Sequence, residues 1–351
     1  MDAPTPDDDA PFPPVSWNEI EEHLIGHLYI DDEWMSRGPQ SLTWWPWFLE
    51  QNFRVTASGT WDDENPDDNY VTVLASTPIV SCDEATGRTL CEEARYDFPL
   101  GSFVWEEGVL ALVTSLSLNP KCRGLLSLFH EAALAQALAA HVCAGAWDER
   151  DDVDIEVLAS AHPTSGPREE ADELLRLFAG DGRSDGWARI PDGDALLARG
   201  RRTALETLSS MGWTVARSED AFDMLTAPRG TLMIGLMTGS DDEGRYGQGL
   251  GLVVPLTAPD HSFTEAEVNN CALAMTEHPV TSLLGSIRTD SRQDGYGTHL
   301  FVYLTSGYLA ANRFSDRDIG IAIVNAALHA CSAVSMFWQE VEASQGQREE
   351  R

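Results

Sequence analysis

The sequence predicts an α+β protein of two tandem units, each an antiparallel sheet packed by helices. At 351 residues with 43% hydrophobic side chains, the chain is long enough to fill two cores. A strand followed by a long apolar helix occurs twice, at 109–143 and 299–338, and "LGSF" and "LGSI" stand just upstream of the two passages. We therefore predict the order α-β-β-(β)-α-β-β-α in each unit.

Composition divides the chain into tails, units and a linker. The start is rich in Pro and Asp, which predicts disorder, and the middle is rich in Asp, Gly and Pro, which is typical of a linker. One helix is expected inside that linker, at about 168–179. The predicted parts are a disordered acidic tail at 1–15, a first unit at 16–147, a linker at 148–199, a second unit at 200–341 and a disordered tail at 342–351.

Local signals place the elements of the first unit. Ser16 and Glu19 have the spacing of a capping box, which predicts a helix directly after Ser16. Pro46 fits only the first turn of a helix, so residues 41–53 are predicted to contain a helix that starts near Trp45. The other expected elements are strands at 53–58 and 70–77, a helix at 83–96, a hairpin that turns at Glu107-Gly108, and an apolar helix at 123–143.

The second unit is predicted to repeat this order with one added strand. Its expected elements are a helix at 201–211, strands at 212–218, 231–239 and 249–257, a helix at 264–278, strands around 283–289 and 299–309, and a helix at 316–338. The offset between the copies drifts in one direction, which favours duplication. Three matched positions give the difference in residue number between the copies: 160 for Phe53 and Trp213, 161 for Val71 and Leu232, and 184 for Leu100 and Leu284.

Charge and composition exclude several classes of partner. The 57 acidic and 23 basic side chains give a net charge of -34, which repels nucleic acid and anionic membrane surfaces. Residues 1–70 contain 16 carboxylates and only two arginines, so this end is solvating or partner-facing. Polar side chains interrupt the apolar passages at 125–144 and 319–337, and the first residues lack the positive charge of a signal peptide. With six cysteines in no paired motif, we predict a cytoplasmic protein.

No motif assembles a catalytic, cofactor or metal site. The glycines of "GQGLG" at 247–251 precede a strand, whereas a phosphate-binding loop precedes a helix. The acidic loop at 62–69 lacks the glycine turn of a calcium loop, and His23 and His27 have no third ligand nearby in sequence. We therefore predict a protein that is not an enzyme, with no catalytic residue, cofactor or metal.

Aromatic side chains are the predicted partner-binding residues. Three tryptophans within "TWWPW" stand too close in sequence to face one core, so at least one is exposed or covered by a neighbouring element. The two long apolar helices need cover on two sides, which the sister unit, a second chain or a ligand can supply. The residues predicted to bind a peptide or partner are Trp44, Trp45, Trp47, Tyr303, Tyr308 and Trp338.

The second unit resembles the YbjN family of bacterial sensory transduction regulators, which shares the type III secretion chaperone-like fold. The segment "TEAEVNNCALAMTEHPVTSLLGSI" is similar to the central helix and following strand of that family, and "THLFVYLTSGYLAANRFSDRDIGIAIVNAALHACSAV" to its last strand and closing helix. The resemblance covers residues 200–341 and, more weakly, 41–147. Asn269-Asn270 stands where the family often has Trp-Asn, and the loop "DSRQDGYG" is longer than usual.

This resemblance implies a non-catalytic, chaperone-like module that holds an extended client segment by β-edge pairing or apolar docking. It also implies a homodimer, which the tandem chain could replace with an intrachain pseudo-dimer. The acidic field favours a basic client. The alternative is an acidic immunity or inhibitor protein that blocks a basic toxin or nuclease, and a small-molecule enzyme is the third candidate.

Overall fold

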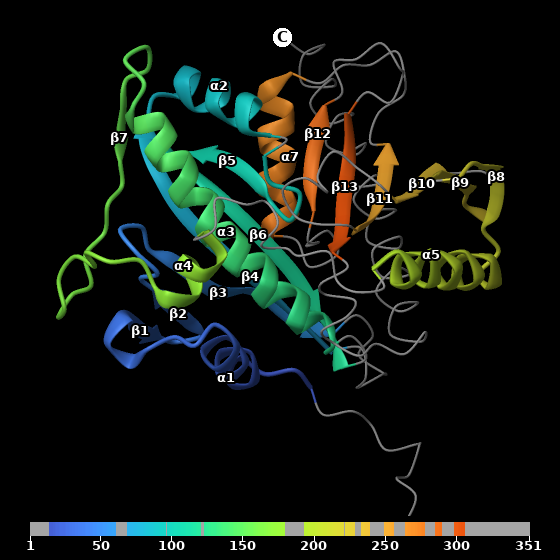
Figure 1. Ribbon diagram of the computed structural model, residues 1–351, viewed down its shortest axis with the longest axis horizontal. Coiled ribbons are helices and arrows are strands. Elements are labelled where there is room, and N and C mark those ends of the chain that lie inside the picture. Colours follow the sequence, from blue (N-terminus) through green and yellow to red (C-terminus); the bar gives the residue numbers. More distant parts are fainter. Residues whose placement is uncertain are drawn as a thin grey trace, which may run out of the picture.

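The protein is a mixed α+β structure in which helices pack on two antiparallel sheets, as the sequence predicts (Figure 1). The computed structural model describes residues 14–60, 69–95, 97–120, 123–179, 193–220, 222–228, 233–238, 249–255, 264–277, 285–289 and 298–305.

The first sheet has seven strands. In spatial order, six of them are β1 (Met35–Gly38), β2 (Ser41–Trp44), β3 (Gln51–Thr60), β4 (Asn69–Cys82), β6 (Val109–Leu118) and β5 (Ser102–Glu106). The seventh, β7 (Ile155–Val157), pairs with the C-terminal end of β4. The second sheet, in spatial order, is β8 (Thr214–Ser218), β9 (Phe222–Thr226), β10 (Met233–Thr238), β11 (Gly249–Pro255), β13 (Thr298–Thr305) and β12 (Ser286–Thr289).

The two sheets share one strand order. In each, the first four strands lie side by side in chain order, the sixth pairs with the fourth, and the fifth lies at the edge. The helices α2 (Glu84–Ala94) and α7 (Glu265–Glu277) both fall between the fourth and fifth strands of this order. The other helices in the described residues are α1 (Trp17–His27), η1 (Asp32–Trp34), α3 (Leu125–Asp148), α4 (Glu173–Ala179) and α5 (Gly193–Ser210).

The predicted helix cap at Ser16 and the predicted hairpin turn at Glu107-Gly108 are both confirmed. The Ser16 side chain accepts a hydrogen bond from the Glu19 N–H (3.3 Å) and begins α1, which buries Ile20 and Leu24. The hairpin between β5 and β6 turns at Glu107-Gly108, and both residues have positive φ (49° and 90°), as a two-residue type I′ turn requires.

The helix predicted over residues 41–53 is wrong. Residues 41–44 form β2, and Leu42 and Trp44 are buried while their neighbours Ser41 and Thr43 are half-buried. This period of two is that of a strand, and Pro46 lies in the bend between β2 and β3 instead of a first helical turn.

The missed strands also correct the predicted register between the units. Phe53 lies in the third strand of the first sheet, whereas Trp213 precedes the first strand of the second sheet, so the two are not equivalent. The partners Leu232 and Leu284 of the other two predicted pairs lie outside the described residues, as do the predicted helix at 316–338 and the two predicted tails except Pro14 and Val15.

Helix α3 forms the core of the first unit by packing across β4 and β6 (Figure 1). Among the described helices it alone is long and apolar enough to cross a membrane, and 67% of its most apolar window is buried inside the protein. Its one buried amide, Gln136, donates to the carbonyls of Ala75 (3.1 Å) and Leu112, and Gln51 donates to the Ala133 carbonyl (2.8 Å). These bonds satisfy polar groups that burial would otherwise leave unpaired.

The segment after α3 runs along the first sheet. Besides the pairing of β7 with β4, the Ser160 N–H donates to the Phe48 carbonyl (2.8 Å), and the Asp172 N–H donates to the Pro46 carbonyl (2.7 Å). The part of the predicted linker that lies between α3 and α4 is therefore bound to the first unit, and α4 lies within the predicted helix at 168–179.

Candidate functional site

The tryptophans of "TWWPW" lie mainly inside the first unit. Trp44 is fully buried and Trp45 is 4% exposed, whereas Trp47 is half-buried. The Trp45 Nε1–H donates to Ser160 Oγ (3.1 Å), and the Trp47 Nε1–H donates to the Glu169 carbonyl (3.3 Å). Burial makes Trp44 and Trp45 core residues of the folded chain, which leaves them no surface for a partner. Trp45 and Trp47 instead fasten the segment after β7 to the sheet.

The other predicted partner-binding residues belong to the second unit. Tyr303 lies in β13, where Gly251 of β11 is its cross-strand partner. Tyr308 and Trp338 lie outside the described residues. Of this second group, the described residues therefore include only Tyr303.

An open groove lies beside the tryptophan cluster, with a volume of about 770 Å³. One wall is the turn that follows α1, with Tyr29 and Asp31, and η1, with Trp34. The other wall is the segment 167–177, which includes the first residues of α4. Sequence reasoning missed this groove because its walls stand more than a hundred residues apart in the chain.

The groove is acidic. Its lining includes five carboxylates, whereas its two arginines are both engaged: Arg168 donates to the Trp45 carbonyl (2.7 Å), pairs with Asp172 (3.1 Å) and lies 4.9 Å from the centre of the Trp34 ring, and Arg176 lies 3.7 Å from Glu170. The carboxylates are Asp31, Glu169, Glu170, Asp172 and Glu173.

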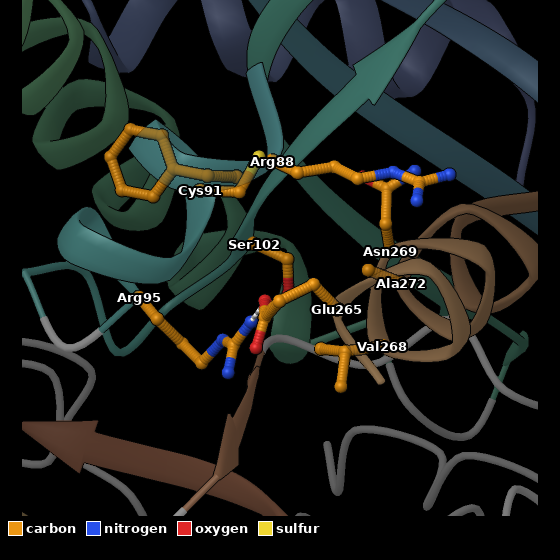
Figure 2. A pocket seen from close by; sticks show the side chains of 9 residues that line it. Arg88, Cys91, Arg95, Ser102, Glu265, Val268, Asn269 and Ala272 are labelled. Carbon is orange, nitrogen blue, oxygen red and sulfur yellow. Dashed lines mark hydrogen bonds and ion pairs between the residues drawn. The ribbon is translucent and has the colours of Figure 1, made fainter. Parts of the chain in front are cut away.

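A second cavity lies where the two halves of the chain meet, between α2, β5 and α7 (Figure 2). Arg95, directly after α2, has a side chain that is 6% exposed and forms an ion pair with Glu265 of α7. The Asn269 side chain of α7 accepts from the Trp105 N–H (2.7 Å) and donates to the Trp105 carbonyl (2.8 Å). Because β5 is an edge strand, this amide occupies main-chain groups that a further strand would otherwise use.

The junction cavity has no chemistry of an active site. Its volume is about 20 Å³, room for about one water molecule. Burial raises the pKa of the Cys91 thiol, which lines it, to about 12. A thiol that stays protonated is a poor nucleophile. The cavity is therefore a packing feature of the contact between α2 and α7.

Three histidines gather where α1 packs on α3. His23 Nε2 lies 2.9 Å from His130 Nδ1, and the His27 ring stacks on that of His23 with centroids 3.9 Å apart. Burial, and then the neighbouring imidazoles, lower the pKa of His23 to about 4 and of His130 to about 3. His130 lies more than a hundred residues from His23 and His27 in the chain, so sequence reasoning missed it as their neighbour. In the described part of the chain, no three His, Cys, Asp or Glu side chains are arranged to hold a metal ion.

We expect Glu131→Gln to stabilise the protein at alkaline pH. Burial raises the pKa of Glu131 from 4.5 to about 7, so the unfolded chain ionises first as pH rises from about 4.5, and the folded state loses stability up to about pH 7. The glutamine removes this penalty, and the free energy of unfolding should rise by about 1 to 3 kcal/mol at pH 8.

The gain from Glu131→Gln should shrink toward zero near pH 4, where both states are protonated. Urea unfolding at pH 4, 6 and 8 measures it, with Glu22→Gln at an exposed position of α1 as the control. A gain that does not change with pH would contradict the buried-carboxylate explanation.

The sheet edges differ in how they are covered. The outer edge of β5 is met by Asn269, and His162 Nε2 lies 3.2 Å from the Met35 carbonyl of the edge strand β1. At β8, by contrast, all five side chains are exposed. Among the described residues, none outside β9 forms a hydrogen bond with the β8 main chain. As far as the described residues go, the outer end of the second sheet, far from the first unit, is thus open for main-chain pairing (Figure 1).

A buried ion pair holds β8 in place. Arg201 of α5 lies 2.5 Å from Asp223, which is 1% exposed, and donates to the carbonyls of Glu219 (2.6 Å) and Asp220 in the turn between β8 and β9. Ser218 of β8 also donates to Asp223 (2.6 Å). Burial raises the pKa of Asp223, but the hydrogen bonds from Arg201 and Ser218 outweigh it and hold that pKa below its ordinary value.

Comparison of the chain with protein-family models, with curated proteins and with solved structures found no match in any of the three.

Proposed function

We propose that the chain is a non-catalytic, chaperone-like module that holds an extended segment of a client protein. In this proposal the chain consists of two tandem copies of a type III secretion chaperone-like unit of the YbjN kind. The shared strand order of the two sheets supports duplication, and so do the equivalent places of α2 and α7. Because α2 packs on α7, the two copies would form a pseudo-dimer within one bacterial, cytoplasmic chain.

The open edge of β8 is the observation that carries the proposal. An extended peptide that pairs with this edge gains main-chain hydrogen bonds whatever its sequence, as a protein that holds unfolded segments requires. Two large apolar side chains, Val215 of β8 (46%) and Met211 just before it in the chain (39%), are partly exposed. They offer shallow contacts to the peptide's side chains.

A peptide with modified main-chain groups tests this mode of binding. We expect a peptide of about 12 residues, with Lys or Arg alternating with Val or Leu, to bind with a micromolar dissociation constant. The same peptide N-methylated at alternate residues loses the donors on one edge and should bind at least about tenfold more weakly. Calorimetry measures both, and equal affinity would exclude strand pairing.

A matched pair of variants locates the binding edge. Val215→Lys adds a charge to β8, which opposes strand addition, and should weaken peptide binding by about tenfold. Ser209→Lys adds the same charge at an exposed position of α5 and should leave the affinity within about twofold. Equal effects of the two variants would mean that only the added charge matters and that β8 is not the site.

The acidic groove favours a second candidate, an immunity or inhibitor protein against a basic toxin or nuclease. Such a protein would bind one folded basic partner with a dissociation constant below nanomolar, and salt would weaken that binding strongly. Micromolar binding of several extended peptides, only partly weakened by salt, supports the chaperone-like function instead.

A further inference from the structure

We propose that the groove between the turn after α1 and the segment 167–177 docks a basic segment of the client, with Lys or Arg side chains beside an aromatic or aliphatic one. This inference rests on the proposed function, because it identifies the chemical class of the client and gives it a second contact, on the first unit. The occupant is an extended segment of a partner protein.

Apolar exposure in the groove is the first argument. Tyr29 is 74% exposed and Leu177 is 70% exposed, the two highest values among large hydrophobic side chains in the described ranges. Single exposed apolar residues are ordinary, but these two line one groove from opposite walls. Together they form an apolar surface that a partner's side chain can cover.

The backbone of Tyr29 is the second argument. Its φ of 50° lies in the left-handed region, which residues other than Gly, Asn and Asp rarely adopt. Glycine is the usual residue directly after a helix because it lacks this strain. A bulky tyrosine held there with its ring in solvent indicates a role outside the folding of its own chain.

Charge complementarity chooses the partner. Glu169, Glu170 and Glu173 are exposed on one wall and Asp31 on the other, while the arginines of the lining already contact protein groups. This surface attracts Lys and Arg and repels phosphate. A second copy of the chain is a poor occupant, because its net charge is also -34.

The groove is built before a partner arrives. The Asp172 N–H donates to the Pro46 carbonyl (2.7 Å), the Leu174 N–H donates to Asp172 Oδ1 (2.9 Å), and Trp47 holds the Glu169 carbonyl. Binding therefore needs little ordering of this wall, so less of the interaction free energy is lost to conformational entropy.

Removal of the charges from one wall tests the groove. In the full chain, calorimetry should show two binding sites for the Lys/Arg peptide described above, one at β8 and one at the groove. Glu169→Gln, Glu170→Gln and Glu173→Gln together should weaken binding at the groove site alone, at least about tenfold at about 0.1 M salt, and reduce the salt dependence of that site. The matched control is Glu92→Gln, Glu106→Gln and Glu107→Gln, which removes three exposed carboxylates around α2 and the β5–β6 hairpin. The control should change the affinity less than about twofold, and the melting temperature should stay the same in both.

The apolar contacts are tested separately. Tyr29→Asn keeps a residue that tolerates the left-handed backbone, and Leu177→Ser removes an exposed side chain, so neither should lower the melting temperature. Each variant should lower the affinity for the Lys/Arg peptide by about threefold or more.

The outcomes separate this inference from the proposed function. If the two triple Glu→Gln variants weaken peptide binding equally, the groove is not the docking site, because only the net negative charge of the chain would matter. If N-methylation abolishes binding while the groove variants bind normally, the chaperone-like function stands and the docking site is wrong. If sedimentation shows a dimer of the chain that the Glu169, Glu170 and Glu173 variant dissociates, the occupant is a second copy and the inference also fails.

Discussion

Replacement of Arg201 by alanine is expected to lower the free energy of unfolding by about 3 kcal/mol. The substitution leaves the Asp223 carboxylate, 1% exposed, inside the second unit without its cation. It also frees the carbonyls of Glu219 and Asp220, so the turn that orients β8 loses its anchor on α5. Urea unfolding measures the first effect, and loss of peptide binding at β8 measures the second.

Two further variants isolate the buried charge. Arg202→Ala removes an exposed arginine from the next position of α5 and should change stability by less than about 0.5 kcal/mol. Asp223→Asn in the Arg201→Ala background should recover part of the loss, because the unpaired charge is gone while an amide can still bond to Ser218. If the double variant is less stable than Arg201→Ala alone, burial of charge is not the cause.

Replacement of Asn269 by alanine is expected to cost about 2 kcal/mol and to loosen the two halves from one another. Both main-chain groups of Trp105 lose their partners, and β5 regains an open edge. The Trp105 amide should then exchange its hydrogen faster, and urea unfolding should broaden or separate into two transitions. Mass spectrometry of hydrogen exchange follows this amide.

The neighbouring Asn270 is the control for Asn269. It is exposed on the same helix, so Asn270→Ala should leave both stability and exchange at Trp105 unchanged. Unchanged exchange at Trp105 in the Asn269→Ala variant would show that contacts such as the Arg95–Glu265 ion pair hold the halves together without the asparagine.

Local rules succeeded where neighbours in sequence supply the whole interaction. The Ser16 cap bonds to a residue three positions away, and the turn at Glu107-Gly108 needs only the conformation of two residues. The rule for Pro46 failed because the buried side chains of Leu42 and Trp44 decided the structure of that segment, and their environment is the rest of the sheet. The missed strands β1, β2, β7 and β9 are short, so each shows little periodicity of its own.

For the candidate site, composition sets the charge on which the proposed basic partner depends, and the packing of distant segments sets the place where it would bind. The excess of carboxylates over basic side chains is a property of composition, so the expectation of a basic partner does not depend on the fold. Which aromatic side chains reach solvent depends on packing between distant segments: Trp44 is buried in the core, whereas Tyr29 is exposed in a groove whose opposite wall carries Leu177. The open edge of β8 is likewise tertiary, because an edge is defined by which strands fail to pair, and no single stretch of sequence records that.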